Sequence, residues 1–387
     1  MNSPSLLERA RGLRDLIQAE ADATEALGTM SPAVVDAIEE AGLFRILVPA
    51  ELGGHEVDID TLLAISEELS YADGSVGWSF VQNTTLGGYL AYLDPELARP
   101  FAKRRAGAGM FAPLGVAREE PGGYRVSGKF QFGSGSGHAE YIGGAALVMD
   151  GDEVVAPGED GSVPVIGFLV RRENVVIADN WDVMGLRGTG SYDFEVPEQF
   201  VEGGATWPVL QRGRARALTG GPIYGLGSIV LGTIGSVAFA VGVAQRALDE
   251  MADIARGGRA RLGQVPLAEQ QIFQRDFGRH SMAVQSARRF AREQYNAAVD
   301  AIAGEADAET VEQRLRETKP AATYVVQVCL DVVTKTWRQS GSLGIRNPSA
   351  LQRCFRDLSV GAGHLVFDER NYNEYAKSVL GIEPSPF

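Results

Sequence analysis

The strongest constraint on the fold is a long uncharged run in the second half of the chain. From Ala217 to Gln245 the sequence reads "ALTGGPIYGLGSIVLGTIGSVAFAVGVAQ" and contains no Asp, Glu, Lys or Arg. A run of this length can cross a membrane, or it can form a helix that is buried on all sides. Gly, Ala and Ser dominate it, and three arginines, at 212, 214 and 216, precede it. We interpret it as a buried helix whose small residues allow close approach, and we expect no membrane association.

The composition indicates a folded protein with small-molecule partners. Of the 387 residues, 45% are apolar and 22% are charged, which is enough for a large core in two or three domains. The net charge of −14 argues against binding to nucleic acid. Only Cys329 and Cys354 are present, and no apolar signal segment follows Met1. We therefore expect a reduced, cytoplasmic protein, and we expect no bound metal.

Hydrophobic periodicity divides the chain into three zones. Residues 1–105 have helical spacing and clear helix starts, such as Ser31-Pro32. Residues 106–207 hold short β-branched or aromatic runs between turn residues, which is typical of a small barrel or sandwich. Residues 208–387 return to helical spacing and predict four long helices, the count of a bundle. We expect an α+β protein with a helical domain, a β domain and a four-helix bundle, in that order. The last three helices of the bundle are expected at 267–304, 309–340 and 349–381.

Five local strings add a signal that no single one of them carries. They are "GLFRILVPAELGG" (42–54), "SYADGSVGW" (70–78), "GGYRVSGKFQFGSGSGHAEY" (122–141), "WDVMGLRGTGSYDFEVPEQFV" (181–201) and "QRCFRDLSVGAGH" (352–364). In this order the chain resembles the acyl-CoA dehydrogenase fold over nearly its whole length. Within that superfamily the strings are more similar to the class D flavin-dependent monooxygenases than to the dehydrogenases.

One C-terminal position separates the two chemistries. Many acyl-CoA dehydrogenases carry an Ile-Tyr-Glu-Gly string a few residues after an Arg-Asp pair, and its glutamate removes the α-proton of the thioester. After Arg356-Asp357 this chain reads "LSVGAGHLVF", which places His364 and Leu365 there. Some dehydrogenases keep their glutamate elsewhere in the bundle, so an FAD-dependent acyl-CoA dehydrogenase stays the alternative. A scaffold protein that has kept the fold without flavin is a third possibility.

The resemblance implies a two-component monooxygenase. Such an enzyme receives reduced flavin, FMNH2 or FADH2, from a separate NAD(P)H-dependent flavin reductase. The flavin reacts with O2 to give a C4a-hydroperoxide, which hydroxylates an aromatic or polycyclic small molecule. This chemistry needs a dry pocket, a hydrogen bond near flavin N5 and a base for the substrate. The resemblance also implies a homotetramer.

His364 and Ser134 are the residues to which the resemblance assigns the chemistry. His364 is expected to face flavin and substrate as base or orienting group, and an unperturbed histidine has a pKa of about 6.5. A capping or packing role is the alternative. Ser134 is expected to form the hydrogen bond on the N5 side, with Phe132, Gly133, Gly135 and Ser136 shaping the approach to the flavin. The alternative for this stretch is an ordinary Gly-Ser hairpin.

His138 and the helix after Trp78 supply further candidates. His138 either lines the pocket or caps the next strand. Trp78 is a candidate apolar wall, or a core residue. Several class D enzymes carry a second histidine in the following helix, where this chain has "SFVQNTTLGGYLAYL". That departure makes a simple phenol a doubtful substrate and makes Gln82 and Asn83 candidate substrate contacts.

Three more residues are expected near the phosphates of the cofactor. The string "WRQSGSLG" (337–344) resembles a turn that meets the pyrophosphate from a neighbouring subunit, which makes Gln339 and Gly341 candidates. Arg259 lies where relatives supply an arginine to the phosphates, although a solvated loop explains it equally well.

Two further expectations concern the surroundings of the site. We expect "RGTGS" (187–191) to be a turn that borders the pocket or only connects strands, and we expect Asp357 to pair with an arginine.

Overall fold

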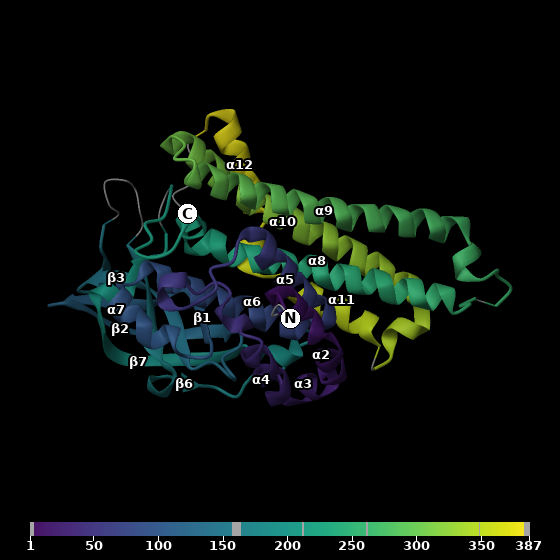
Figure 1. The fold of residues 1–387 in the computed structure, drawn as a ribbon, viewed down its shortest axis with the longest axis horizontal. Helices are drawn as coiled ribbons and strands as arrows, with labels where there is room; N and C mark the ends of the chain where they lie inside the picture. Colours follow the sequence, from purple (N-terminus) through teal and green to yellow (C-terminus); the bar gives the residue numbers. More distant parts are fainter. Residues whose placement is uncertain (1–3, 157–163, 211–212, 261, 348, 383–387) are drawn as a thin grey trace.

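The computed structural model describes residues 4–156, 164–210, 213–260, 262–347 and 349–382. Its N-terminal part is helical, its middle part is a β-sheet and its C-terminal part is built of long helices (Figure 1). The N-terminal helices are α1 (Leu6–Gly12), α2 (Arg14–Ala19), α3 (Ala21–Leu27), α4 (Pro32–Glu40), α5 (Ile59–Ala72), α6 (Gly74–Tyr89) and α7 (Pro95–Ala102). The strands are β1 (Gly107–Glu120), β2 (Gly123–Gly133), β3 (Tyr141–Asp150), β4 (Glu153–Val154), β5 (Val165–Arg171), β6 (Val176–Ile177), β7 (Tyr192–Glu202) and β8 (Thr206–Pro208). The C-terminal helices are α8 (Gly227–Arg256), α9 (Gln271–Ala303), α10 (Ala308–Ser340), α11 (Ala350–Gly361) and α12 (Arg370–Leu380).

Side-chain caps begin the helices that position the site. Ser31 accepts a hydrogen bond from the Val34 amide at the start of α4, as the sequence predicts. Asp73 does the same for the Val76 amide at the start of α6. Such a cap satisfies an amide that has no partner inside the helix. Nearly every side chain of α6 is buried, so this helix is fixed on all sides.

The strands form one mixed sheet, in the order β6-β7-β2-β1-β3-β5-β8, with β4 paired to β3. β1 and β3 are parallel, and the other neighbours are antiparallel. Phe130 of β2 stacks on Phe194 of β7 at 4.9 Å and meets Phe168 of β5 at 6.3 Å. These three strands are not all neighbours, so the sheet wraps around a core of its own. The predicted barrel or sandwich is therefore a single wrapped sheet.

Helix α8 is the centre of the helical part and contains most of the uncharged run. Within the described residues, Pro222–Arg256 is the one segment long and apolar enough to span a membrane, and 83% of its most apolar window is buried. Glycines allow its neighbours to touch its backbone. A Cβ on Gly242 would lie 2.5 Å from the Glu67 carbonyl of α5, and one on Gly235 would lie 2.6 Å from Val81 of α6. The run is thus buried in the protein, as the second interpretation predicts.

The fourth predicted helix is interrupted, which corrects the expectation of one helix over 349–381. Helix α11 ends at Gly361, a short 3-10 turn follows at Leu365–Phe367, and α12 begins at Arg370. A Cβ on Gly361 would lie 2.6 Å from the ring of Phe239 in α8, so the last turn of α11 lies against α8. The break places His364 between the two helices, at the edge of this contact.

One apolar core joins the N-terminal helices to the C-terminal helices, and it runs from Ala10 to Phe367. The sheet has a second core. The fold prediction of helices, strands and helices in this order is confirmed. The division into domains at 105/106 and 207/208 stays a proposal; these positions fall between α7 and β1 and at the end of β8.

Candidate active site

Trp78 is the side chain around which the candidate site is built. It lies on α6, is buried, and donates its indole N–H to Oγ of Ser134 at 3.0 Å. Its ring centroid lies 5.6 Å from that of His364 and 5.0 Å from that of Phe239. Elements from all three zones of the chain therefore meet at one indole, and predicted residues Trp78, Ser134 and His364 come together.

A chain of hydroxyl groups leads away from Ser134. Oγ of Ser134 lies 2.7 Å from Oγ of Ser191, which in turn lies 2.6 Å from Oγ1 of Thr189. Thr189 donates its hydroxyl to the Leu186 carbonyl at 2.8 Å. All three hydroxyl-bearing residues are buried, with Ser134 the most exposed at 6%. The "RGTGS" turn thus forms one wall of the site through its side chains.

The loop that carries this chain is attached to α11 through Asp357. The backbone amide of Leu186 donates to Oδ1 of Asp357 at 2.6 Å. A Cβ on Gly185 would lie 2.2 Å from the Arg356 carbonyl, so only glycine lets the loop approach the helix this closely. Leu186 itself has a left-handed backbone, with φ of 54°. The loop is therefore held in a conformation that it would rarely adopt alone.

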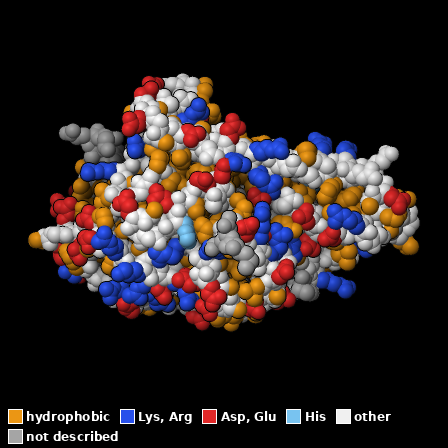
Figure 2. Space-filling model, in the orientation of Figure 1, with side chains coloured by type: hydrophobic (Ala, Val, Ile, Leu, Met, Phe, Trp, Pro, Cys, Tyr) orange, Lys and Arg blue, Asp and Glu red, His pale blue; other side chains and the backbone are white. Residues whose placement is uncertain are grey.

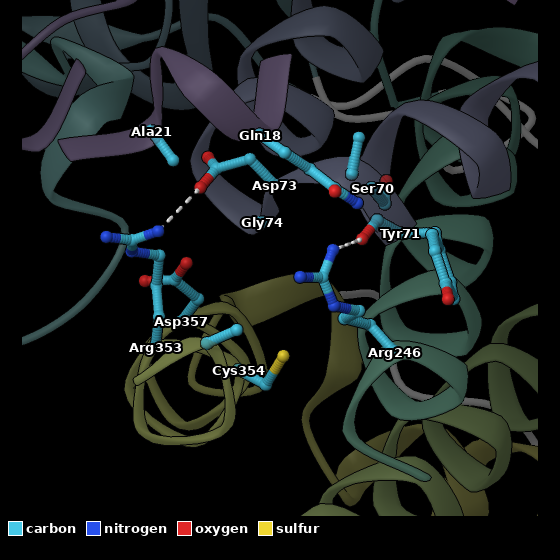
Figure 3. Close-up of a pocket in the computed structure, with 12 residues that line it drawn as sticks. Gln18, Ala21, Ser70, Tyr71, Asp73, Gly74, Arg246, Arg353, Cys354 and Asp357 are labelled. Carbon is cyan, nitrogen blue, oxygen red and sulfur yellow. Dashed lines mark hydrogen bonds and ion pairs between the residues drawn. The ribbon is translucent and has the colours of Figure 1, made fainter. Parts of the chain in front are cut away.

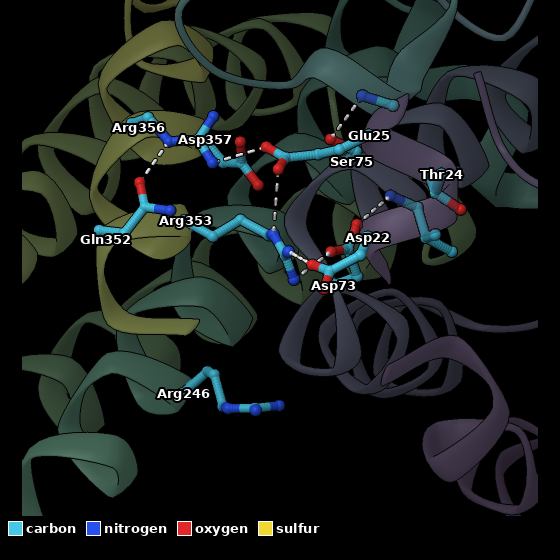
Figure 4. Close-up of polar contacts among 12 residues, drawn as sticks. Asp22, Thr24, Glu25, Asp73, Ser75, Arg246, Gln352, Arg353, Arg356 and Asp357 are labelled. Atoms are coloured by element: carbon cyan, nitrogen blue, oxygen red, sulfur yellow. Dashed lines mark hydrogen bonds and ion pairs between the residues drawn. The ribbon is translucent and has the colours of Figure 1, made fainter. Parts of the chain in front are cut away.

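Arginines of α11 bind acidic residues other than Asp357, which corrects the predicted pairing. Arg356 binds Glu25 at 2.6 Å, and Arg353 binds Asp22 and lies 3.9 Å from Asp73 (Figure 4). Asp357 is completely buried, and its Oδ2 has no hydrogen-bond partner among the described residues. Burial, together with the nearby charge of Asp73, raises the pKa of Asp357 to about 8.

A small cavity lies beside these carboxyl groups. It measures about 40 Å³ and is lined by Asp73, Gly74, Arg353 and Asp357, among others (Figure 3). Arg246 of α8 reaches its other side and donates to the Tyr71 carbonyl at 3.4 Å. Asp73 caps α6, the helix of Trp78, and Asp357 holds the loop of Thr189. These two carboxyl groups therefore fix two walls of the site, and neither lies among the residues that face Trp78.

His364 occupies the gap between α11 and α12. Its Nδ1 accepts a hydrogen bond from the Val366 amide at 3.2 Å. Burial lowers its pKa to about 4, so the ring is neutral at neutral pH. Because Nδ1 accepts this bond, the proton of the neutral ring lies on Nε2. In this arrangement His364 offers a donor to the site, and this favours an orienting group over a base with an ordinary pKa.

His138 and Asn83 form a separate buried pair. Nε2 of His138 lies 2.8 Å from Oδ1 of Asn83, whose amide nitrogen donates to the Gly107 carbonyl at 2.7 Å. Burial and the nearby charge of Arg105 lower the pKa of His138 to about 4. Nδ1 of His138 is buried and has no partner among the described residues. His138 and Asn83 thus connect α6 to the sheet, while Gln82 is half-buried one turn after Trp78 on the same helix.

The glycine-rich stretch is an ordered turn. Gly135 has a φ of 80°, and a Cβ there would lie 2.4 Å from the Asn83 amide. Ser136 is completely buried and donates to the Gly190 carbonyl at 3.0 Å, so its hydroxyl is already used by the protein. A Cβ on Gly133 would meet Phe194 at 3.0 Å. Of the two serines in this stretch, Ser134 is therefore the one whose hydroxyl group faces Trp78.

The residues around Ser134 fit a flavin ring. Phe132 has a φ of 61° and is 54% exposed, and its ring meets that of Trp181 edge-on at 6.2 Å. Met184, exposed on the same loop as Trp181, adds another apolar side chain. An exposed apolar wall next to a hydroxyl group matches a flat aromatic ring with polar atoms at its edge. The donor set of this wall is therefore compatible with the cofactor.

The predicted phosphate contacts lie elsewhere in the same chain. Arg259 follows α8, while Gln339 and Gly341 lie at the end of α10. Both helix ends lie toward the extremity of the bundle that is away from the sheet (Figure 1). Gly341 has a φ of 61°, and the turn is fixed by the Trp337 indole, which donates to the Gly344 carbonyl at 2.7 Å. The structure does not bring these residues to Ser134 of the same chain.

Asp73 is the site residue that the sequence reasoning missed; Thr189 and Ser191 were named only as part of a turn that borders the pocket or connects strands. Two hydroxyl residues separated by one glycine, directly before a strand, were the available signal for Thr189 and Ser191. Nothing in the local sequence around Asp73 indicates its proximity to Asp357, because the two residues are brought together only by the packing of α6 on α11.

Comparison with known proteins places this fold and site. Residues 8–99 match the acyl-CoA dehydrogenase N-terminal domain, and residues 234–369 match the acyl-CoA dehydrogenase C-terminal domain. Indole-3-acetate monooxygenase of Pseudomonas putida is 30% identical over 91% of this chain and 88% of its own length. The oxygenase component of FADH2-dependent resorcinol hydroxylase of a Rhizobium species is 28% identical over 98% and 95%. The crystal structure of 3-HSA hydroxylase from a Rhodococcus species superposes with a TM-score of 0.88, at 23% identity, over 100% of this chain and 99% of that one.

The matches to both family models and the fold place this flavoprotein in the acyl-CoA dehydrogenase superfamily. Within it, the chain belongs to the flavin-dependent monooxygenases. The predictions of the fold, the enzyme class and the reduced flavin cofactor are confirmed. The named relatives favour a monooxygenase over the acyl-CoA dehydrogenase and scaffold alternatives.

Proposed function

We propose that this chain is the oxygenase component of a two-component system and that it hydroxylates an aromatic or polycyclic small molecule beside Trp78. The observation that carries the proposal is the position of Trp78, which bonds to Ser134 on one side and packs against His364 on the other. Bound reduced flavin supplies two electrons to O2, so that one oxygen atom enters the substrate and the other leaves as water.

Ser134, Phe132 and Trp181 are proposed to hold the flavin. Phe132 and Trp181 offer apolar faces, and Ser134 offers an oxygen at the ring edge. Trp78 and Phe239 would form the apolar walls of the substrate site, where they exclude water. The choice between FMN and FAD depends on phosphate contacts, and Arg259, Gln339 and Gly341 can supply these only from another subunit.

His364 is proposed to orient the substrate by donating a hydrogen bond from Nε2. A neutral imidazole with an accepting Nδ1 can hold a hydroxyl, carbonyl or ring-nitrogen acceptor of a substrate. The low pKa makes it a weak base for proton removal at neutral pH. This role suits heteroaromatic and polycyclic substrates as well as phenols.

A separate flavin reductase and further copies of this chain are the proposed protein partners. The relative's designation as an oxygenase component supports the reductase. Large apolar side chains are exposed on the long C-terminal helices, and Figure 2 shows hydrophobic side chains among Lys and Arg on that half of the molecule. These exposed side chains include Ile272, Met282, Phe290, Tyr324, Val379 and Leu380. Covering them with identical subunits is consistent with a homotetramer. The cytoplasm is the proposed location.

Oxygen-18 labelling tests the proposed function. The purified chain, reduced FAD or FMN and a panel including indole-3-acetate, resorcinol and a polycyclic phenol are mixed under 18O2, and products are analysed by mass spectrometry. We expect one 18O atom in a hydroxylated product, and formation of this product about 100-fold slower when His364 is replaced by alanine. Reduction of bound oxidised flavin by an acyl-CoA, without oxygen incorporation into any substrate, would refute the proposal.

A further inference from the structure

The hydroxyl chain at Ser134 has only one possible direction. The Leu186 carbonyl has no hydrogen to give, so Thr189 must donate its hydroxyl to it. Thr189 then has only lone pairs left for Ser191, so the Ser191 hydroxyl donates to Thr189. Each hydroxyl group has a single hydrogen, and the hydrogen of Ser191 is now used.

The same logic sets the state of Ser134. Since Ser191 can only accept, Ser134 must donate its hydrogen to Ser191. The Trp78 indole N–H, which is a donor only, takes one lone pair of Ser134. One lone pair therefore remains on Oγ of Ser134, and no hydrogen is left for a ligand.

We propose that Thr189 and Ser191 are positioning residues that hold the Ser134 hydroxyl as an acceptor toward the flavin. The proposal rests on the proposed function, because it takes the flavin to lie against Ser134. N5 of oxidised flavin is an acceptor without hydrogen, whereas N5 of reduced flavin carries a hydrogen. A fixed acceptor bonds to the reduced form and faces the oxidised form lone pair to lone pair. The chain of hydroxyl groups therefore selects reduced flavin and favours release of the flavin once the flavin is oxidised.

The Leu186 carbonyl, at which the chain of hydroxyl groups ends, is held by bonds from outside the site. The Leu186 carbonyl that ends the chain also accepts the Trp181 indole at 3.0 Å, and the Leu186 amide is held by Asp357. These bonds fix the carbonyl direction, and the carbonyl direction fixes every hydroxyl before it. Polarity at Ser134 is thus set by a backbone group of a strained residue three hydrogen bonds away.

Anaerobic flavin binding measures the selection directly. Dissociation constants for dithionite-reduced and for oxidised FAD and FMN are determined by tryptophan fluorescence for the purified chain and its variants. We expect Thr189→Val and Ser191→Ala each to lower the preference for reduced flavin roughly fivefold, the size of one net neutral hydrogen bond. Thr189→Ser, which keeps the hydroxyl, is expected to retain the preference within about twofold.

Two further variants make the test specific. Ser79→Ala is the matched control. Ser79 donates to the Thr189 carbonyl at 3.2 Å, so the substitution removes a buried hydrogen bond and leaves the hydroxyl chain unchanged. Its preference should equal that of the parent. Ser134→Ala should lose the preference altogether. Melting curves show which variants are folded. If Thr189→Val does not fold, the flavin preference of Ser191→Ala tests the inference.

The outcomes separate the inference from the proposed function. If Ser134→Ala loses the preference while folded Thr189→Val and Ser191→Ala keep it, the directed chain is refuted and the flavin placement stands. If Ser134→Ala binds both flavin forms as the parent does, the placement of flavin at Ser134 is wrong, and the inference falls with it.

Discussion

Nδ1 of His364 accepts the backbone N–H of Val366 at 3.2 Å, in the gap where α11 gives way to α12. This bond makes the imidazole the cap of a short turn as well as a wall of the site. The capping role, which the sequence offered as an alternative to chemistry, is here the reason why Nε2 carries the proton. The two roles therefore support each other.

The protonation state of His364 can be tested by NMR. Burial lowers its pKa to about 4, so we expect the ring to titrate well below the ordinary value of about 6.5. Protein labelled with 13C-histidine is titrated, and the His364 signal is identified by its loss in His364→Ala. The His138 signal, which is also expected to titrate at about 4, is assigned through His138→Gln. A midpoint near 6.5 for His364 would contradict the neutral donor.

Replacement of His364 by glutamine distinguishes donation from base catalysis. The amide nitrogen of glutamine can donate a hydrogen bond, but the group cannot take up a proton at neutral pH. We expect His364→Ala to lower the rate of product formation about 100-fold. His364→Gln should retain activity to within about tenfold of the parent. Reduced-flavin affinity should change little in either variant. Equal losses in both variants would point to a base.

Asp357 should make stability depend on pH. Its unfolded value is near 3.8 and its folded value is raised to about 8, so over this interval the folded state keeps a proton that the unfolded state has lost. Stability conferred by this group is complete below about pH 4 and is lost as the pH rises toward 8. Asp357→Asn keeps an acceptor for Leu186 and cannot ionise. We therefore expect its unfolding free energy, relative to the parent, to rise by at least about 1 kcal/mol between pH 5 and pH 8.

Urea unfolding at several pH values measures this difference. Asp253→Asn, at an exposed carboxylate of α8, controls for the general loss of a negative charge. A constant offset between Asp357→Asn and the parent across the pH range would show that Asp357 is ionised in the folded protein.

Gly135 and Gly122 form a matched pair for the turn at Ser134. Both have positive φ, 80° and 90°, but a Cβ on Gly135 meets the Asn83 amide at 2.4 Å while one on Gly122 meets nothing within 4 Å. Gly122→Ala should cost only the backbone strain, about 1–2 kcal/mol. Gly135→Ala should cost more and also weaken flavin binding. Thermal melts and flavin titrations check both statements, and equal effects of the two variants would mean that Asn83 moves aside freely.

The sequence was sufficient for the order of the elements, because periodicity and caps such as Ser31 are local. It was also sufficient for predicting that Trp78, Ser134 and His364 lie close together, through strings similar to those of relatives. It was not sufficient for the break after Gly361, where the last turn of α11 packs against Phe239 of α8. Neither a helical period nor a turn preference contains such a contact.

The partners of polar groups were the least predictable part. Asp357 was expected to bind an arginine, yet the adjacent arginines bind Glu25 and Asp22, and Asp357 binds a backbone amide. Which of several acidic residues an arginine reaches depends on the packing of α3 and α6 against α11. Which ion pair forms depends on small differences in three-dimensional distance, and sequence separation does not encode these differences.

The close contact between Gly242 of α8 and the Glu67 carbonyl of α5 affects the order of events at the ribosome. Residues 73–226 are synthesised between these two helices, and this takes on the order of 10 s at about 5–20 residues per second. During that interval the face of α5, and that of α6 once it has been made, remain without the cover that α8 will provide. The nascent chain therefore exposes apolar surface that favours aggregation until its central helix has left the exit tunnel.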